Sequence, residues 1–288
     1  MMYYVFYSQP KEVIFGKNGW MFFQSGNIIE RHRGILKLTD KQIETFLNIQ
    51  KERKEWFLSQ GIEYFLVIAP NKESIYPEYL PKWATKVDEK DLDNLIRKLK
   101  FEAKINVIDA SFLINLKSKY PMYLPSESHW TDIAAFFVYQ ELMNEIKKKI
   151  ANFPSPFKFE DMKIIPDYRN GGDLAIYLGL LEKMYISNPL VRLKDEKNFK
   201  IVLSNGRDHT YLNNTYKDFN IVVFADSFGG NWTHYMPEHF NIVRWSQTYG
   251  VDIEDIENYK PKIVISQYAE RQLYGAMNIP NPSKMKKN

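Results

Sequence analysis

The chain has 288 residues, of which 44% are hydrophobic and 26% are charged, with 39 Lys and Arg against 35 Asp and Glu. This composition is typical of a globular protein, and a net charge of only +4 argues against a nucleic-acid binder. Because the chain has no cysteine, disulfides, thiolate metal sites and cysteine nucleophiles are excluded.

Membrane and targeting signals are weak. The longest nearly continuous apolar runs, residues 62–69 and 133–139, are far shorter than the roughly 20 residues that span a bilayer, so we expect no membrane helix. Residues 1–7 have neither the basic start nor the small-residue cleavage site of a signal peptide. On these grounds alone the compartment stays open.

The first third of the chain gives clear local signals. Residues 13–15 and 20–23 flank a Gly-Lys-Asn-Gly segment, which predicts a β-hairpin. Thr39 and Gln42 form a capping box and Gly61 stands where a helix would end, so a helix is expected over residues 40–60. The apolar run 64–69 predicts a strand buried on both faces.

Strands and helices then alternate. The pattern predicts a helix over residues 92–99, a strand at 105–108 and a long helix that includes residues 137–150. Further strands are expected at 221–224, 241–245 and 263–265, with a short helix after the first of them and another near 252–258. The alternation predicts an α/β fold, a parallel sheet covered by helices. We expect one domain over residues 1–288, with an N-terminal hairpin region at 1–38 and an irregular insertion over the sheet at 151–218.

One loop carries a candidate nucleophile. In a parallel sheet, ligands gather at the carboxyl ends of the strands. Ser227 follows the predicted strand 221–224 at a sharp turn into a helix, so its hydroxyl can project from the sheet edge. The backbone N–H groups that follow, at Phe228 and Gly229, are candidates to hold an oxyanion. The alternative is that Asp226 or Ser227 only caps the helix.

A serine nucleophile needs a base, and the positions of the histidines narrow the choice. No histidine follows His239, and His234 and His239 fall close behind the serine, so a C-terminal catalytic histidine is excluded. His129 lies upstream, and Glu127, two residues before it, points the same way in an extended segment and can orient the imidazole. A capping histidine or a single metal pair is the alternative.

Cofactor signatures are missing. The sequence contains no phosphate-binding loop, dinucleotide fingerprint or zinc-protease helix motif. His234 and His239 are five residues apart and do not share one helix face. We therefore expect neither a metal nor a cofactor.

Six blocks stand out along the chain: residues 13–22, 67–77, Glu-Ser-His-Trp at 127–130, Gly-Asp-Leu at 172–174, Asp-Ser-Phe at 226–228, and 268–273. Taken together and in this order, they resemble the alginate O-acetyltransferase family of SGNH-hydrolase-like proteins, the AlgX and AlgJ type, whose triad order is permuted. The resemblance implies Ser227 as nucleophile, His129 as base and Glu127 as orienting acid. Two departures, Glu127 in place of the usual Asp and Ala225 in place of the usual Gly, leave a weakened or decayed site open.

The resemblance also implies a function. It suggests transfer of an acetyl group onto a hydroxyl of an exopolysaccharide or cell-surface glycan through an acyl-serine, outside the cytoplasm, with the donor supplied by a membrane-bound O-acyltransferase. No C-terminal carbohydrate-binding module is expected, so polymer would bind along the catalytic domain. Asn71, Trp130 and Arg271 are further candidates for oxyanion or substrate contacts. The rivals are a carbohydrate acetylesterase with the same triad and a non-catalytic polysaccharide-binding or assembly subunit.

Overall fold

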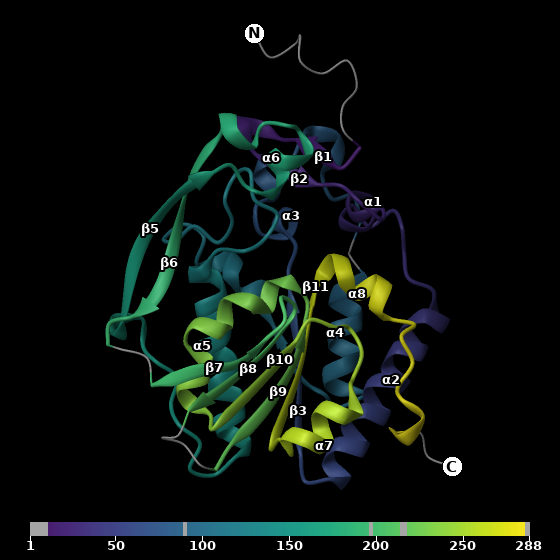
Figure 1. Ribbon diagram of the computed structural model, residues 1–288. Coiled ribbons are helices and arrows are strands. Elements are labelled where there is room, and N and C mark those ends of the chain that lie inside the picture. The colour runs from purple at the N-terminus through teal and green to yellow at the C-terminus, as the bar shows by residue number, and fades with distance from the viewer. Residues whose placement is uncertain (1–10, 89–90, 196–197, 214–217, 286–288) are drawn as a thin grey trace.

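A seven-stranded sheet forms the centre of the computed structural model, which describes residues 11–88, 91–195, 198–213 and 218–285 (Figure 1). The strand order is β4-β3-β11-β9-β10-β8-β7. The strands are β1 (Val13–Phe15), β2 (Met21–Phe23), β3 (Glu63–Ala69), β4 (Asn106–Asp109), β5 (Met162–Asn170), β6 (Tyr185–Leu193), β7 (Phe199–Ser204), β8 (Asp208–Asn213), β9 (Asn220–Ala225), β10 (Ile242–Ser246) and β11 (Ile263–Ala269). The expectation about a signal peptide concerns residues 1–7, which lie outside this part of the chain.

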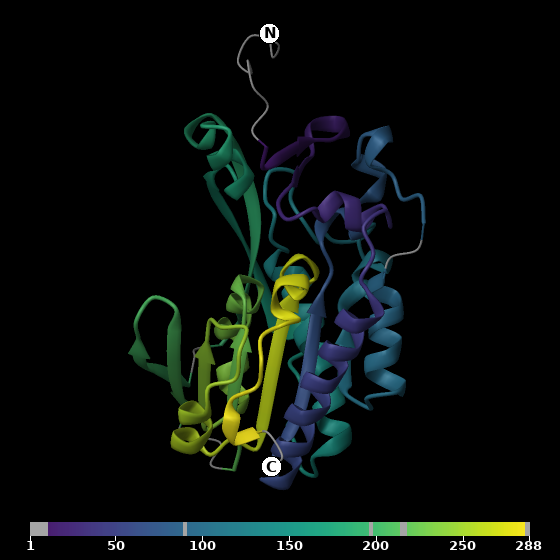
Figure 2. The ribbon, with the colours of Figure 1, turned by 90° about the vertical axis from the view of Figure 1, so that its right-hand side faces the viewer.

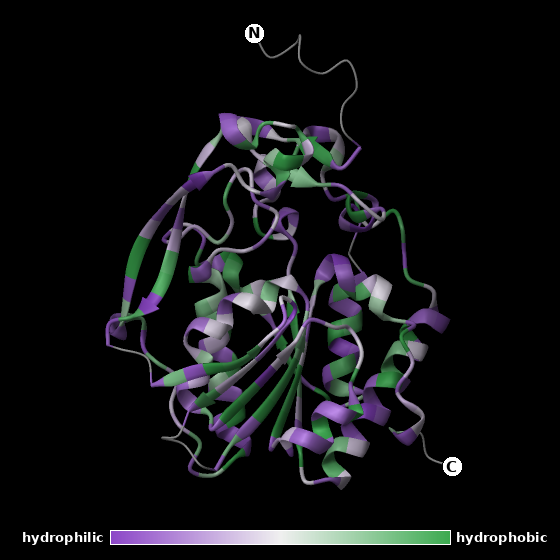
Figure 3. Ribbon diagram, in the orientation of Figure 1, coloured by the Kyte–Doolittle hydropathy of each residue, from purple (hydrophilic) through white to green (hydrophobic). Residues whose placement is uncertain are grey.

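The predicted parallel strands pair as expected. Strands β4, β3, β11, β9 and β10 run parallel to one another, and these are the five strands that the apolar runs indicate. Side chains alternate between two cores: Phe65 and Val67 of β3 face one, while Tyr64 and Leu66 face the other. The strands are therefore hydrophobic along most of their length (Figure 3).

Helices cover both faces of the sheet. The α-helices are α1 (Ile28–His32), α2 (Asp40–Ser59), α3 (Lys72–Ile75), α4 (Asp91–Phe101), α5 (Asp132–Lys149), α6 (Asp173–Tyr177), α7 (Ile253–Tyr259) and α8 (Glu270–Ala276). Apolar side chains of α2, α4, α7 and α8 belong to one core and those of α5 to the other. These helices therefore lie on opposite faces of the sheet (Figure 2). Within the described residues, no helix combines the length and apolar character needed to cross a membrane.

Local signals in the sequence are confirmed at several ends. The capping box of Thr39 and Gln42 opens α2, and Gly61 adopts φ +70° just after that helix ends. The predicted hairpin is β1 and β2, which pair with Val13 opposite Phe23. The helix expected after Ser227 is a 3-10 helix, η7 (Ser227–His234), rather than an α-helix.

The region expected as an irregular insertion, residues 151–218, is more ordered than its sequence suggests. Strands β7 and β8 extend the main sheet instead of lying over it: β8 pairs antiparallel with β10, and β7 pairs antiparallel with β8 at the edge. Strands β5 and β6 form a separate antiparallel ribbon. The ribbon, the β1–β2 hairpin and α6 lie together beyond the carboxyl ends of the parallel strands, which is where a site is expected (Figure 1).

Candidate active site

Ser227 lies exposed at the turn between β9 and η7. The buried Asp226 carboxylate holds this turn, because it accepts the Phe228 N–H at 2.9 Å and the Ala269 N–H at 2.6 Å. Burial raises the pKa of Asp226. A side chain at Gly229 would lie 2.6 Å from the Ala225 Cβ, so this tight turn requires glycine there.

His129 meets Ser227 from the segment that precedes α5. The His129 Nε2 atom lies 2.8 Å from the Ser227 Oγ atom. Thr131 caps α5 by accepting the Ala134 N–H, which fixes where the segment ends. The two sides of the site are joined directly, because the Trp130 indole N–H donates to the Phe228 carbonyl at 2.9 Å.

Two carboxylates face the other nitrogen of His129. Its Nδ1 atom lies 3.1 Å from Glu127 Oε1 and 3.2 Å from Asp173 Oδ2. Asp173 also accepts the Ser128 N–H at 2.7 Å and the Ser128 hydroxyl, while Glu127 accepts a hydrogen bond from Arg169 at 3.2 Å. These contacts make Nδ1 the proton-bearing nitrogen and leave Nε2 to accept from the serine.

The charges of the two carboxylates act on His129. Burial alone disfavours the imidazolium, but the hydrogen bonds to Asp173 and Glu127 outweigh it and raise the pKa of His129. Burial would likewise raise the pKa of Asp173, yet its hydrogen bonds with His129 and its other neighbours lower it. Asp173 is therefore ionised at neutral pH.

A close backbone contact brings Asp173 to this position. A Cβ atom at Gly172 would lie 2.2 Å from the Ser126 carbonyl oxygen, so only glycine lets the two segments approach. The Gly172 N–H donates to the Ser126 hydroxyl at 3.2 Å, and the Leu174 N–H donates to the Ser126 carbonyl at 3.1 Å. Gly-Asp-Leu at 172–174 is one of the blocks that resemble the family, but nothing in the sequence pattern gave Asp173 a role.

Lys72 is a second residue to which the sequence pattern gave no role. Its buried ammonium group donates to the carbonyl oxygens of Met21, Leu124 and Pro125 at 2.7 Å and of Glu127 at 3.1 Å. It thereby joins the β1–β2 hairpin to the segment that carries Glu127. Its position in the 67–77 block is the only signal in the sequence.

Asn71 and Arg271 lie on the far side of His129. Asn71 accepts the Arg271 N–H through its side-chain oxygen at 3.0 Å. The Arg271 guanidinium lies 3.3 Å from the Ser128 carbonyl and 3.5 Å from His129 Nε2, between two phenylalanine rings whose centroids are 5.0 Å away. Arg271 is thus a cation beside the reacting atoms, and Asn71 positions the start of its helix.

The expected oxyanion donors need correction. The Phe228 N–H is bonded to the Asp226 carboxylate and the Gly229 N–H to the Asp226 carbonyl at 3.2 Å, so neither points at a ligand. The turn uses both groups to hold its own shape. Ser227, at the first position of η7, has an N–H without an acceptor inside that helix.

Trp130, a candidate for substrate contact, is buried, and so is its neighbour Trp232. Trp130 is 3% exposed and Trp232 is 1% exposed, and the Trp232 indole donates to the Ala135 carbonyl at 3.0 Å. Both side chains pack in the core beneath the site. Neither is available to stack against a sugar; Trp130 joins the His129 segment to the Ser227 turn, and Trp232 joins η7 to α5.

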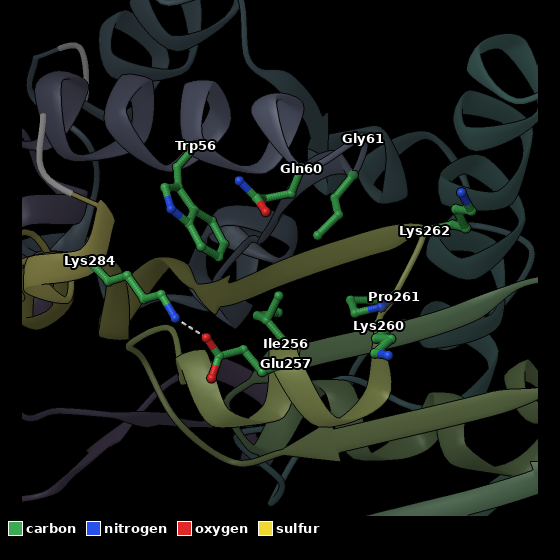
Figure 4. Close-up of a pocket in the computed structure, with 10 residues that line it drawn as sticks. Trp56, Gln60, Gly61, Ile256, Glu257, Lys260, Pro261, Lys262 and Lys284 are labelled. Carbon is green, nitrogen blue, oxygen red and sulfur yellow. Dashed lines mark hydrogen bonds and ion pairs between the residues drawn. The ribbon is translucent and has the colours of Figure 1, made fainter.

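An open cleft of about 500 Å³ lies beside Ser227 and His129. Its far wall is the β5–β6 ribbon, and its floor includes Asp132 and Asn231. Another cleft, of about 460 Å³, lies at the opposite end of the sheet between α2 and α7, where Lys284 pairs with Glu257 (Figure 4). That cleft holds no histidine or serine, so the first one is the candidate active site.

The imidazole of His129 and its two carboxylate neighbours could also form a metal site. Glu127, His129 and Asp173 each place one possible ligand atom within 4.8 Å of the others. Their hydrogen bonds already use the Nδ1 position that a metal would need. The absence of a metal site stays a prediction.

Comparisons with solved structures show a similar fold. Bacillus cereus PatB1, solved with a sulfonyl adduct, has a TM-score of 0.70 at 15% identity and covers 93% of this chain and 100% of its own. The O-acetyltransferase domain of Pseudomonas putida AlgJ has a TM-score of 0.59 at 16% identity, over 96% of this chain and 95% of its own. Pseudomonas aeruginosa AlgX has a TM-score of 0.57 at 16% identity, over 92% of this chain and 66% of its own. No curated protein matches the sequence.

The structural similarities by themselves show only the fold. The match to a sequence family shows more, because it assigns the chain to that family. Residues 13–209, more than half of the chain, match the family described as the SGNH hydrolase-like domain of acetyltransferase AlgX. The matched segment contains Glu127, His129 and Asp173 and ends before Ser227. The chain belongs to the AlgX family of SGNH-hydrolase-like acetyltransferases.

Proposed function

We propose that this protein transfers an acetyl group onto a hydroxyl of an extracytoplasmic polysaccharide through an acyl-Ser227 intermediate. The observation that carries the proposal is the 2.8 Å contact between Ser227 Oγ and His129 Nε2, with two carboxylates on the opposite nitrogen. This is the arrangement that activates a serine hydroxyl. Because the chain belongs to an acetyltransferase family, we infer that the transferred group is acetyl.

The first half-reaction loads the serine. Ser227 Oγ attacks the acetyl carbonyl carbon while its proton passes to His129 Nε2, and the resulting imidazolium is stabilised by Glu127 and Asp173. His129 then returns that proton to the leaving group of the donor as the old ester bond breaks. We propose the Ser227 N–H and the Arg271 guanidinium as the donors to the tetrahedral oxyanion.

The second half-reaction transfers the acetyl group from Ser227 to the glycan. A hydroxyl of the glycan gives its proton to His129 and attacks the acetyl carbon, and Ser227 Oγ leaves with the proton from His129. The acceptor ester and the free serine are the products. By the family resemblance, a membrane-bound O-acyltransferase provides the donor.

Intact-protein mass spectrometry tests this function. After a short pulse of 4-nitrophenyl acetate, we expect one added acetyl group that maps to Ser227 and persists after the donor is removed. Glycan from the producing organism should shorten the lifetime of this adduct and emerge acetylated. Acetate as the sole product with every glycan would favour the esterase, and no adduct at all would favour the non-catalytic subunit.

A sulfonyl fluoride gives an independent check. PatB1 forms a sulfonyl adduct, and sulfonyl fluorides react with activated nucleophiles. We expect phenylmethanesulfonyl fluoride to modify Ser227 of this chain and to block acetylation by the ester. Modification at another residue, with acetylation intact, would contradict the assignment.

A further inference from the structure

The cleft beside Ser227 has one wall that the reaction chemistry does not use, the β5–β6 ribbon. In this antiparallel ribbon Asp167 pairs with Asn188, and both face the cleft together with Arg169 and Arg192. The neighbouring pair, Tyr168 and Ser187, points to the opposite face. An acceptor that reaches Ser227 must therefore pass along a defined row of polar side chains.

The two arginines of the ribbon that line the cleft are already paired with carboxylates. Arg169 donates to Glu127 at 3.2 Å, and Arg192 donates to Asp132 at 2.5 Å. The Asp167 carboxylate has no ion-pair partner among the described residues. The lining thus has three carboxylates against two paired guanidinium groups.

This charge arrangement discriminates between classes of glycan. Along the ribbon, a uronic acid or phosphate group would meet carboxylates while both guanidinium groups are already paired, and juxtaposed like charges are costly. Sugar hydroxyls and acetamido groups face no such penalty. Asn188 is buried with no hydrogen bond to its amide from the described residues, and the Asn231 amide nitrogen is turned toward Asp132, which leaves its oxygen to accept.

We propose that the cleft between Ser227 and the β5–β6 ribbon is the acceptor subsite, and that it takes a glycan segment of uncharged sugar units rather than a uronate or phosphate polymer. This inference rests on the proposed function. Asn188 and Asp167 bind sugar hydroxyls and so hold one of them near the acetyl carbon, where its effective concentration exceeds that of water.

Fractionated glycan tests the substrate class even when the chemical structure of the polymer is unknown. Surface glycan from the producing organism is stripped of its esters with mild alkali, cleaved to oligosaccharides and divided by anion exchange into unretained and retained pools. Each pool is added at equal sugar concentration to the full chain carrying acetyl-Ser227. We expect the unretained pool to discharge the adduct at least about tenfold faster than buffer and to become acetylated.

The other outcomes separate the two proposals. Faster discharge by the retained pool, or no acceleration by either pool, would overturn the inference about the acceptor. Failure to form acetyl-Ser227 would instead contradict the proposed function. Discharge by the unretained pool should also be insensitive to salt between about 50 and 500 mM, because exposed charge pairs are screened and uncharged contacts are not.

A pair of ribbon variants locates the subsite. Asn188→Asp removes an amide donor that faces the cleft, whereas Ser187→Asp adds the same charge one residue away on the opposite face. We expect Asn188→Asp to raise the KM for the unretained pool about fivefold, and Ser187→Asp to leave it unchanged. Equal KM values in the two variants would place the acceptor elsewhere.

Discussion

The two sides of the candidate site are built in different ways. The nucleophile side is local: Asp226, Ser227 and Gly229 are close in sequence, and the end of a buried strand holds them. The base side is assembled from distant segments, because His129 depends on Asp173 and Lys72, which lie far from it along the chain. The nucleophile side depends mainly on one turn. The base side depends on the β1–β2 hairpin, α6 and the segment before α5 all being in place.

The family match covers the base side and not the nucleophile turn. The matched segment, residues 13–209, spans the separate parts that assemble the base side. The Ser227 turn lies beyond it and carries only a short signature. We therefore expect substitutions on the nucleophile side to remove the chemical step, and substitutions on the base side to disturb the geometry around His129.

Ser227→Ala breaks the nucleophile side with the largest effect. The variant removes the attacking oxygen but leaves the turn, whose hydrogen bonds come from Asp226 and backbone groups. We expect the rate of nitrophenol release from 4-nitrophenyl acetate to fall on the order of a thousandfold or more, with an unchanged unfolding midpoint. A rate equal to that of the wild type would remove Ser227 from the chemistry.

Lys72→Met breaks the base side through its support. Four carbonyl oxygens lose their donor, so we expect a loss of about 3 kcal/mol in the free energy of unfolding, measured by denaturant titration. Lys54→Met is the control, because Lys54 donates to one exposed carbonyl, that of Lys104. Equal destabilisation by both variants would show that the buried contacts of Lys72 add nothing.

Asp173→Asn and Glu127→Gln compare the two carboxylates of His129. Activity needs neutral His129, so it rises with pH through the pKa of His129, which the carboxylates raise. Removing either charge lowers that pKa and moves the acid limb of the rate profile to lower pH. We expect the larger shift, with a rate loss of about ten- to a hundredfold, for Asp173→Asn, because Asp173 is anchored by Ser128 while Glu127 is shared with Arg169.

The measurement is the pH profile of acetyl-Ser227 formation between about pH 5 and 8 for each variant and for the double variant. A merely structural role for Asp173 would lower the rate at every pH without moving the limb. An unmoved limb in Asp173→Asn, together with a shifted one in Glu127→Gln, would leave Glu127 as the single orienting acid.

The sequence predicts the sheet better than the site. Buried strands such as β3 and β9 are predicted by their apolar runs, and the start of α2 is predicted by Thr39 and Gln42. Both signals are local in the sequence. Strands β7 and β8 and the ribbon are not predicted, because the exposed residues of strands such as β5 and β7 interrupt the apolar pattern of a buried strand. Their place in the fold depends on pairing with segments that no local signal identifies.

The site shows the same limit. Chain order and strand ends make Ser227 and His129 candidates, the family resemblance implies that they act together, and the structure places them in contact. Asp173 reaches His129 only because Gly172 lies against Ser126, a contact between segments about 45 residues apart. The engaged N–H groups of Phe228 and Gly229 depend on how Asp226 turns, which the residue types alone leave undetermined.

The smallest predicted effect concerns a structural hydrogen bond between the two sides, that of Trp130. Trp130→Phe removes the indole N–H that donates to the Phe228 carbonyl, and Trp232→Phe removes an equivalent bond to the Ala135 carbonyl, on the side of η7 that packs against α5. Both tryptophans are buried, and each change deletes one hydrogen bond and a similar volume, so each should cost about 1–2 kcal/mol of unfolding free energy. The Trp130 bond runs from the His129 segment to the Ser227 turn, whereas the Trp232 bond does not reach that segment, so we expect only Trp130→Phe to lower kcat for acetyl transfer, by about threefold to tenfold, with little change in KM. Denaturant titration and steady-state kinetics on both variants separate the two contributions. Equal kcat values would mean that the turn and the histidine segment hold their relative positions without this bond, and that the sheet and α5 alone align the two sides.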